Sequence, residues 1–565
     1  MRKFLILTVI LAACGKTAEN SPVTDAATAD ADGANAVDVA AEVSGTADAQ
    51  AEVDAGAQVG NPQACADLQE SYLAWNPGPY GVHRHEVADD FTLPLMDGSS
   101  WNFKEHFLGC ENYVFLTDIV PVSDLDATSL WENSKDLDAL LKKSPMNTHY
   151  FFVSLSSAAK ADTALQAMAD RVATVVAKLP QENQQHWTDH LHVVQTRGQE
   201  LDGWIHDVVL GHGQLGFGID RTQHIRGFGL MADVTRSDSA LQAANKWPWK
   251  ANLAYALNEP QYWNAERKRD LQLAADGEVL ELWKGETLAG FAEVTMTVGD
   301  LSTYDTLQVE VDQQCPDADK PEPGNCGAWD YLAWLALKDA NGKMTEIARF
   351  ITSYHRETHW IVDATAMLPL LKAGATTFHW EFAPTWNTQP TRTWLKLRLS
   401  KRNKGMRPTQ ATYLWNGGGW NKNYDAGHPK MDVPIAATTK HVELWALITG
   451  HGGDAPTMCS EFCNHQHDFT VGGKTFRKEH KEAGSSNKCM PNLEKGMVPN
   501  QGGTWWFGRG GWCPGMQVDP WVQDVTDLVK PGQTASIEYH GKYQSATPPD
   551  TGGNIDGGVW LIQYE

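Results

Sequence analysis

Apolar and polar residues follow two different periods along the chain, and the change between them divides it. In the first half, mainly apolar runs at 113–117 and 150–155 predict buried strands, and helical periodicity at 125–141 and 158–179 predicts helices beside them. Strands that alternate with helices are typical of an α/β domain, which we assign to residues 63–258.

The second half has a period of two. Leu307–Val311 and Leu395–Leu399 alternate apolar and polar side chains, Gly-rich turns are frequent, and helical patterns are nearly absent from Tyr262 onward. This pattern predicts antiparallel β structure in two sandwiches or jelly rolls. The expected fold is multidomain, an α/β domain followed by jelly-roll domains at 262–404 and 405–565.

The first residues have the composition of an export signal. Arg2 and Lys3 precede the apolar run 4–10, and Leu11-Ala12-Ala13-Cys14 resembles the bacterial lipobox, in which the Cys is lipidated. Residues 15–62 are rich in Ala and Asp and contain no aromatic residue, which predicts a disordered tether. We therefore expect a signal peptide over 1–14 and a cell-envelope lipoprotein on the outer membrane or cell surface.

Charge and hydropathy exclude other partners. The net charge is −24, so a nucleic-acid partner is not expected. No apolar run reaches the roughly 20 residues of a transmembrane helix, so the membrane should be contacted only through a lipid on Cys14. We expect a monomer.

Eight further cysteines are disulfide candidates, because exported proteins meet an oxidising environment. Spacing alone leaves their connectivity open. As neighbours along the chain they fall into the pairs Cys65 and Cys110, Cys315 and Cys326, Cys459 and Cys463, and Cys489 and Cys513.

The α/β domain carries a sequence signal of its own. The run Asp90-Phe91-Thr92-Leu93-Pro94 and the order of elements over 85–240 resemble the thioredoxin and peroxiredoxin superfamily. Reactive thiols in those enzymes follow the strand that corresponds to 113–117, but residues 118–125 contain no Cys. We therefore expect that this domain lacks redox cysteines and that Cys65 and Cys110 form a structural bridge. The expected role of the domain is binding or spacing.

Three polar residues in the β half are candidates for chemistry. Asp330 and Glu461 each lie in or beside a short loop bounded by cysteines, and Arg509 lies in a Gly-rich stretch between Trp505-Trp506 and Trp512. Carboxylates accept hydrogen bonds from sugar hydroxyls, aromatic rings cover the apolar faces of sugars, and two carboxylates permit general acid–base catalysis. The loop from Cys459 to Cys463 is so short that Glu461 should point outward.

These residues lie in four segments, Cys315-Pro316 to Cys326-Gly327-Ala328-Trp329-Asp330-Tyr331, Glu346 to Tyr354, Gly450-His451-Gly452-Gly453 to Cys463, and Arg509 to Met516. Together they resemble the peptide-N-glycosidase F family over residues 262–565. The resemblance implies two side-by-side jelly rolls with the active site at their interface, and the bridges Cys315–Cys326, Cys459–Cys463 and Cys489–Cys513. It also implies hydrolysis of the amide between Asn and the first N-acetylglucosamine of N-glycoproteins or glycopeptides, with no metal or cofactor.

The resemblance assigns roles to single residues. Asp330 matches the principal catalytic carboxylate, which aligns or activates water. Glu461 matches an acid that orients the sugar, and Arg509 matches an arginine near the scissile amide that can stabilise charge on the carbonyl oxygen. Trp329, Phe462 and Trp512 occupy aromatic positions beside them, and Phe462 replaces a Trp.

This sequence departs from the family at positions expected to touch substrate. Tyr331 stands where the best-known member has Arg, and His451 where a Trp is expected. A third carboxylate belongs on the strand near Trp380 to Trp386. Glu381 is the candidate, although ungapped matching puts Ala383 there. We include Glu381 among the catalytic candidates and Tyr331, Trp386 and His451 among the substrate-binding ones.

Two alternatives stay open. His465-Gln466-His467 places two imidazoles on one face of a strand, which a metal ion could use, and copper-dependent peptide monooxygenases have a similar pair of jelly rolls. A lipoprotein that binds glycans without cleaving them would also fit. The expected function is a peptide-N-glycosidase, an amidase that converts Asn to Asp.

Overall fold

The computed structural model describes residues 65–66, 72–118, 129–212, 216–228, 251–273, 277–452, 460–485, 488–500, 508–549 and 553–565. The chain divides into the units Met1–Ala57 and Gln58–Glu565, and all described residues belong to the second. The predicted signal peptide, Cys14 and the tether lie outside the described residues, as do Cys459, Trp505 and Trp506. Among the described helices, none is long and apolar enough to cross a membrane.

The first part is an α/β layer around a five-stranded sheet of order β5-β4-β3-β6-β7. Its strands are β3 (Asn112–Thr117), β4 (Thr148–Val153), β5 (Leu191–Val193), β6 (Phe217–Ile219) and β7 (Ile225–Gly227). β3, β4 and β5 are parallel, whereas β6 and β7 pair antiparallel. Because helices cover both faces of parallel strands, all six residues of β4 are buried.

Helices and short elements complete this layer. They are β1 (Thr92–Pro94), β2 (Ser100–Asn102), α2 (Phe103–His106), α3 (Ser129–Glu132), α4 (Ser134–Lys143), α5 (Ala158–Val176), α6 (Gln181–His190), η1 (Gly198–Glu200) and α7 (Trp204–His212). The predicted strands and helices are confirmed to within a few residues where the structure describes them, and residues 125–128 of the predicted helix 125–141 lie outside the described residues. A Cys65–Cys110 disulfide is present, also as predicted. The likeness to thioredoxin stays a prediction.

The helix α9 corrects the expectation of β structure from Tyr262 onward. It runs from Ala251 to Gln272, and the first strand of the β part begins only at Glu278. Five successive residues, 256–260, are buried. Apolar side chains of α9 such as Trp263 pack against the α/β layer and against Leu493 of η4 (Met490–Lys495) in one cluster. A helix covered on several sides lacks a polar face, so its sequence shows no helical period.

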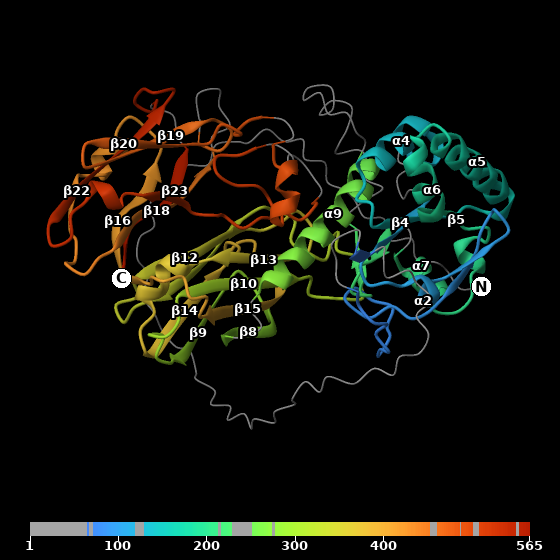
Figure 1. Ribbon diagram of the computed structural model, residues 1–565, viewed down its shortest axis with the longest axis horizontal. Helices are drawn as coiled ribbons and strands as arrows, with labels where there is room; N and C mark the ends of the chain where they lie inside the picture. Colours follow the sequence, from blue (N-terminus) through green and yellow to red (C-terminus); the bar gives the residue numbers. More distant parts are fainter. Residues whose placement is uncertain are drawn as a thin grey trace. The chain divides into compact units, whose positions relative to one another are not determined.

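The first β sandwich consists of two antiparallel four-stranded sheets, of order β13-β10-β15-β8 and β12-β11-β14-β9. Its elements are β8 (Glu278–Leu288), β9 (Phe291–Val298), β10 (Thr306–Gln314), β11 (Leu332–Lys338), β12 (Met344–Ile351), β13 (Thr358–Asp363), η2 (Thr365–Leu370), β14 (Gly374–Glu381) and β15 (Thr391–Ser400). Alternate residues of β10 and β15 point into the core, as their period of two predicts. Figure 1 shows this sandwich in green to yellow.

The second sandwich has sheets of order β16-β23-β18-β21 and β17-β22-β19-β20, again antiparallel. Its elements are β16 (Pro408–Gly419), η3 (Tyr424–Gly427), β17 (Met431–Pro434), β18 (His441–His451), β19 (His465–Val471), β20 (Lys474–Glu479), η4 (Met490–Lys495), β21 (Trp521–Asp524), η5 (Thr526–Leu528), β22 (Thr534–Tyr543) and β23 (Asn554–Tyr564). It is orange to red in Figure 1.

The two sandwiches share apolar contacts. Trp445, Leu447 and Trp560 of the second sandwich belong to the apolar cluster that forms the core of the first. Arg349 of β12 crosses between them and donates hydrogen bonds to Thr449 Oγ1 at 2.8 Å and to the backbone oxygen of Asp556 at 2.7 Å. Strands β11 and β12 therefore face β18 and β23, and the candidate site lies where these strands end.

Candidate functional site

Arg509 lies between the two predicted carboxylates. Its Nε is 3.1 Å from Glu461 Oε1, and its Nη2 is 3.5 Å from Asp330 Oδ2. Only 1% of the Arg509 side chain is exposed, against 16% for Asp330 and 18% for Glu461. The three residues that sequence reasoning singled out are brought together, and the carboxylates are the more accessible groups.

Asp330 is held by the loop that leads into β11. Thr352, just after β12, donates from Oγ1 to the carbonyl of Trp329 at 2.7 Å and accepts at 2.7 Å from the backbone N–H of Tyr331. These two bonds fix the backbone on both sides of Asp330. Tyr354 then donates its hydroxyl to Asp330 Oδ2 at 2.6 Å.

Glu461 follows β18 and turns toward Arg509. Its Oε2 accepts a hydrogen bond from the backbone N–H of Gly452 at 3.1 Å, and its carbonyl accepts from Gly510 N at 2.6 Å. The expectation that Glu461 points outward is wrong, because its charge is satisfied by the Arg509 guanidinium and this backbone N–H. Cys463 is disulfide-bonded, while its predicted partner Cys459 lies outside the described residues.

Two aromatic rings flank the guanidinium of Arg509. Its Cζ lies 4.7 Å from the ring centroid of Trp512 and 5.3 Å from that of Phe462. Trp512 Nε1 donates to the carbonyl of Gly450 at 2.8 Å, and His451 stacks on the Trp512 ring with centroids 5.1 Å apart. Cation–π contacts and hydrogen bonds thus fix the arginine that holds the carboxylates.

Three further aromatic residues form a rim beside Asp330. Trp329 is 48% exposed and Trp386 is 78% exposed, which is unusual for tryptophan. Tyr331 packs edge-on against Trp386 with centroids 5.9 Å apart, and its hydroxyl accepts a hydrogen bond from Asn387 at 2.9 Å. The predicted substrate-binding residues therefore gather around the carboxylates, some as exposed rings.

Burial determines the protonation of the site. Burial raises the pKa of Asp330, although Arg509 and the Tyr354 hydroxyl act against it. Burial also raises the pKa of Glu461, the attraction of Arg509 opposes this, and the nearby charge of Asp330 adds to it. Burial lowers the pKa of His451 to about 3, so this ring is neutral near pH 7. Both carboxylates retain protons at a higher pH than exposed acids do.

Glu381 lies apart from this group. It ends β14 opposite Trp334, which is four positions along the chain from Asp330, and its Oε2 is 3.3 Å from His379 Nε2. Continuing the same register would put Ala383 opposite Leu332, nearer to Asp330, and Ala383 is buried. The structure therefore does not bring Glu381 together with Asp330 and Glu461.

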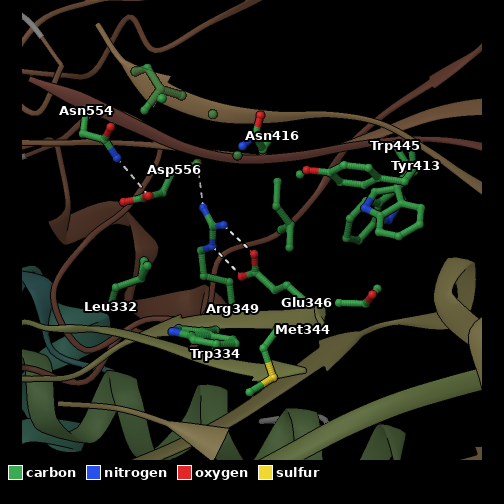
Figure 2. Close-up of a pocket in the computed structure, with 18 of the residues that line it drawn as sticks. Leu332, Trp334, Met344, Glu346, Arg349, Tyr413, Asn416, Trp445, Asn554 and Asp556 are labelled. Atoms are coloured by element: carbon green, nitrogen blue, oxygen red, sulfur yellow. Dashed lines mark hydrogen bonds and ion pairs between the residues drawn. The ribbon is translucent and has the colours of Figure 1, made fainter. Parts of the chain in front are cut away.

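A cavity of about 520 Å³ lies between β11 and β12 on one side and β16, β18 and β23 on the other. Figure 2 shows Trp334, Tyr413 and Trp445 around it, with the Glu346–Arg349 ion pair pointing into its middle. Asp556 on its wall is 3.8 Å from His451 Nε2. His451 thus stands between this cavity and Trp512.

The histidine pair His465 and His467 is buried on β19. His465 Nδ1 is 2.6 Å from His467 Nε2, and His467 Nδ1 is 2.7 Å from the Tyr539 hydroxyl. Together with His480 these rings form a group whose ligand atoms lie within 4.8 Å of one another. Both histidines share one face of β19, as predicted, and their use by a metal stays an open prediction.

Sequence reasoning missed Tyr354 and Thr352. The Tyr354 hydroxyl bonds to Asp330 and is also 3.3 Å from Arg509 Nη2, so it links two candidate residues. Both residues stand at the end of the run Arg349-Phe350-Ile351-Thr352-Ser353-Tyr354, which belongs to one of the four segments that resemble the family. The remaining predicted bridges, Cys315–Cys326 and Cys489–Cys513, are present.

Known proteins resemble parts of this chain. Residues 419–563 match the family model described as peptide-N-glycosidase F, C terminal. Peptide-N(4)-(N-acetyl-beta-D-glucosaminyl)asparagine amidase F of Elizabethkingia miricola is 29% identical over 292 residues, which cover 48% of this chain and 77% of that protein. The C-terminal part of the chain is thus similar to the peptide-N-glycosidase F family.

Solved structures of the family were also found. PNGase F of Flavobacterium meningosepticum, a glycosylasparaginase by its description, is 20% identical with a TM-score of 0.40, over 51% of this chain and 96% of that one. PNGF-II is 14% identical with a TM-score of 0.39, over 53% of this chain and 67% of that one. The family model matches within the second sandwich.

Proposed function

We propose that this protein hydrolyses the amide bond between an asparagine side chain and the first N-acetylglucosamine of N-glycoproteins or glycopeptides. Water adds to the amide carbon, the C–N bond breaks, the asparagine becomes an aspartate, and the sugar leaves as a glycosylamine. The observation that carries this proposal is that Asp330 and Glu461 both pair with one buried arginine beside a rim of exposed aromatic rings.

Asp330 is the group we propose to activate water. A carboxylate that is mostly covered but ionised can accept a proton from a water molecule as that water attacks a carbonyl carbon. Its Oδ2 already accepts the hydroxyl of Tyr354, which fixes the orientation of the carboxylate. The family resemblance supports the same residue.

Glu461 and Arg509 take different parts. Glu461 Oε2 is bound by Gly452 N–H and Oε1 by Arg509, and its remaining lone pairs are placed to accept hydroxyl groups of a sugar. Arg509 is too well covered to be the main contact of a substrate carbonyl, which changes the expectation from sequence. We infer that it positions the two carboxylates and limits the repulsion between them.

The aromatic rim suits carbohydrate. The faces of Trp329 and Trp386 are exposed beside Asp330, and pyranose rings present C–H groups that pack on such faces. The differences at Tyr331 and His451 fall in this region, so glycan preference should differ from that of relatives that carry Arg and Trp there.

The test is a product analysis with the full chain and a denatured N-glycoprotein in ¹⁸O-labelled water. We expect free glycan and conversion of glycosylated Asn to Asp that carries the label. Asp330→Asn should remove the activity, and Asp432→Asn, at an exposed position on β17, should keep it. Glycan binding without any conversion would instead support the rival reading of a glycan-binding lipoprotein.

The anchor is a separate proposal, based only on the Leu11-Ala12-Ala13-Cys14 motif. We propose that Cys14 is lipidated and holds the enzyme at the cell envelope. Detergent phase partitioning of the protein from its own cells should place the native chain in the detergent phase. Cys14→Ser should move it to the aqueous phase.

A further inference from the structure

A cluster of histidines around one buried glutamate lies in the α/β layer, away from the candidate site. Glu111 directly precedes β3, His149 lies on β4, and His190 is the last residue of α6. Glu111 Oε2 is 3.2 Å from His149 Nε2, and Glu111 Oε1 is 3.3 Å from His190 Nε2. Their side chains are 7%, 6% and 13% exposed.

The other nitrogen of each ring has a partner of its own. His190 Nδ1 is 2.7 Å from the backbone oxygen of His186, and a carbonyl can only accept, so Nδ1 carries the hydrogen. His149 Nδ1 is 3.1 Å from His192 Nε2, and the buried His149 Nε2 makes no hydrogen bond despite its proximity to Glu111. The Nε2 atoms of both rings thus face the carboxylate, and His190 Nε2 is within hydrogen-bond distance of Glu111 Oε1.

One ligand atom from each of Glu111, His149 and His190 lies within 4.8 Å of the other two, and the side chains are largely buried. Two imidazoles and a carboxylate are the ligand set that a divalent transition-metal ion uses.

We propose that Glu111, His149 and His190 bind a divalent first-row transition-metal ion, with Zn²⁺ the best match. Ligand atoms about 2.0–2.1 Å from a tetrahedral zinc lie roughly 3.3 Å apart, close to the two nitrogen–oxygen separations observed. The bond from His190 Nδ1–H to a backbone carbonyl is the outer contact that orients metal-bound histidines.

His186 supplies a fourth position. It precedes His190 by one helical turn on α6, and their rings stack with centroids 3.9 Å apart. Its Nε2 is buried and makes no hydrogen bond. Rotation of the His186 side chain toward the other three ligands would complete a set of four protein ligands, which is typical of a structural site. The ion would link the start of β3 to β4 and to the end of α6. This metal site does not depend on the proposed glycosidase activity.

Metal binding by the purified full-length protein tests this inference. After chelation and dialysis, we expect one Zn²⁺ per chain by equilibrium dialysis with elemental analysis, and a higher melting temperature on adding Zn²⁺. Co²⁺ should give the visible absorption of a tetrahedral nitrogen–oxygen site. His190→Gln, at the most exposed ligand, should weaken binding by about 100-fold or more.

Matched variants locate the ion. His540→Gln, on the exposed surface of β22, should leave Zn²⁺ affinity unchanged. Glu111→Gln should abolish the Co²⁺ spectrum, and circular dichroism of His190→Gln shows whether loss of metal reflects loss of fold. If no Zn²⁺ binds, or if affinity survives both the Glu111 and His190 substitutions, as it would for an ion at His465, His467 and His480, the proposal is wrong.

Discussion

At the scale of single residues, the site is a balance between burial and charge. Burial makes ionisation of Asp330 and Glu461 less favourable, and Arg509 and Tyr354 recover part of that loss. A carboxylate with a raised pKa is a stronger base than an exposed one, which suits the removal of a proton from water. The same shift means that the folded state is less stable when the carboxylate is ionised.

Asp330→Asn should separate these two effects. We expect kcat to fall by about 100- to 10,000-fold, the range for loss of a general base. Because the folded pKa of Asp330 is raised, its stabilising effect is present only at low pH and is lost as pH rises through that pKa. The Asn variant should therefore melt at a higher temperature than the native protein at neutral pH, and the difference should shrink on acidification. A lower melting temperature at neutral pH would contradict this account.

Tyr354→Phe tests the hydroxyl that sequence reasoning overlooked. This hydroxyl donates to Asp330 and lowers its pKa, so removing it should raise that pKa further. The acidic limb of the kcat–pH profile should then move to higher pH, with a smaller loss of rate than in Asp330→Asn. A purely structural role would lower the rate equally at every pH.

Glu461 and Glu381 can be compared directly. Glu461→Gln removes a charged hydrogen bond to Arg509, worth about 1.5–3 kcal/mol, so kcat/KM should fall at least about tenfold. Glu381→Gln alters a half-exposed group that contacts His379, and kcat/KM should stay within error. Steady-state assays on one glycopeptide measure kcat/KM for both variants. A large loss of kcat/KM in Glu381→Gln would support Glu381 as the third catalytic carboxylate.

The sequence predicted the charged residues of the site better than their surroundings. Asp330, Glu461 and Arg509 stand beside cysteines, glycines and tryptophans that make their segments recognisable. The direction of Glu461 was not predictable, because its partner Arg509 comes 48 residues later and the bond forms only in the folded chain. Tyr354 was missed for the same reason, since its contacts join three separate segments.

At the scale of elements, strands with one buried face were predicted well, and α9 was not. β10 and β15 alternate because each has one core face, whereas α9 is buried on several sides and shows no period. The bridges were a different case. Spacing left their pairing open, and the family resemblance supplied it, in agreement with the two that the structure describes in this part.

The Cys489–Cys513 bridge should matter for activity as well as stability. It encloses Arg509 and Trp512 and joins their loop to η4. Replacing both cysteines by Ala should lower the free energy of unfolding by about 2–4 kcal/mol and reduce kcat, because Arg509 loses a fixed position. Replacing Cys65 and Cys110 by Ala is the matched control. Calorimetry should show a less stable α/β layer, and a glycopeptide assay should show an unchanged kcat.

At the scale of the whole molecule, Arg356 ties the parts of the chain together. It lies between β12 and β13 and pairs with Glu259 of α9 and with Glu322, at 2.9 Å between Nε and Oε2. It also donates to the carbonyl of Gly227 at 3.1 Å, at the end of β7, and to the carbonyl of Pro499. One buried side chain thus contacts the α/β layer, α9 and both halves of the β part.

Arg356→Met should leave two buried carboxylates without their cation, which destabilises a protein by about 3–5 kcal/mol. Arg477→Met breaks the more exposed pair with Asp468 and should cost less than about 1 kcal/mol. Burial already raises the pKa of Glu259 to about 7, and loss of Arg356 raises it further. A raised folded pKa means stability is lost as pH rises, so the melting temperature of Arg356→Met should fall more steeply than that of the native protein from about pH 5 to about pH 8. Parallel melting curves for the two proteins across this range would show that Glu259 and Arg356 are not coupled.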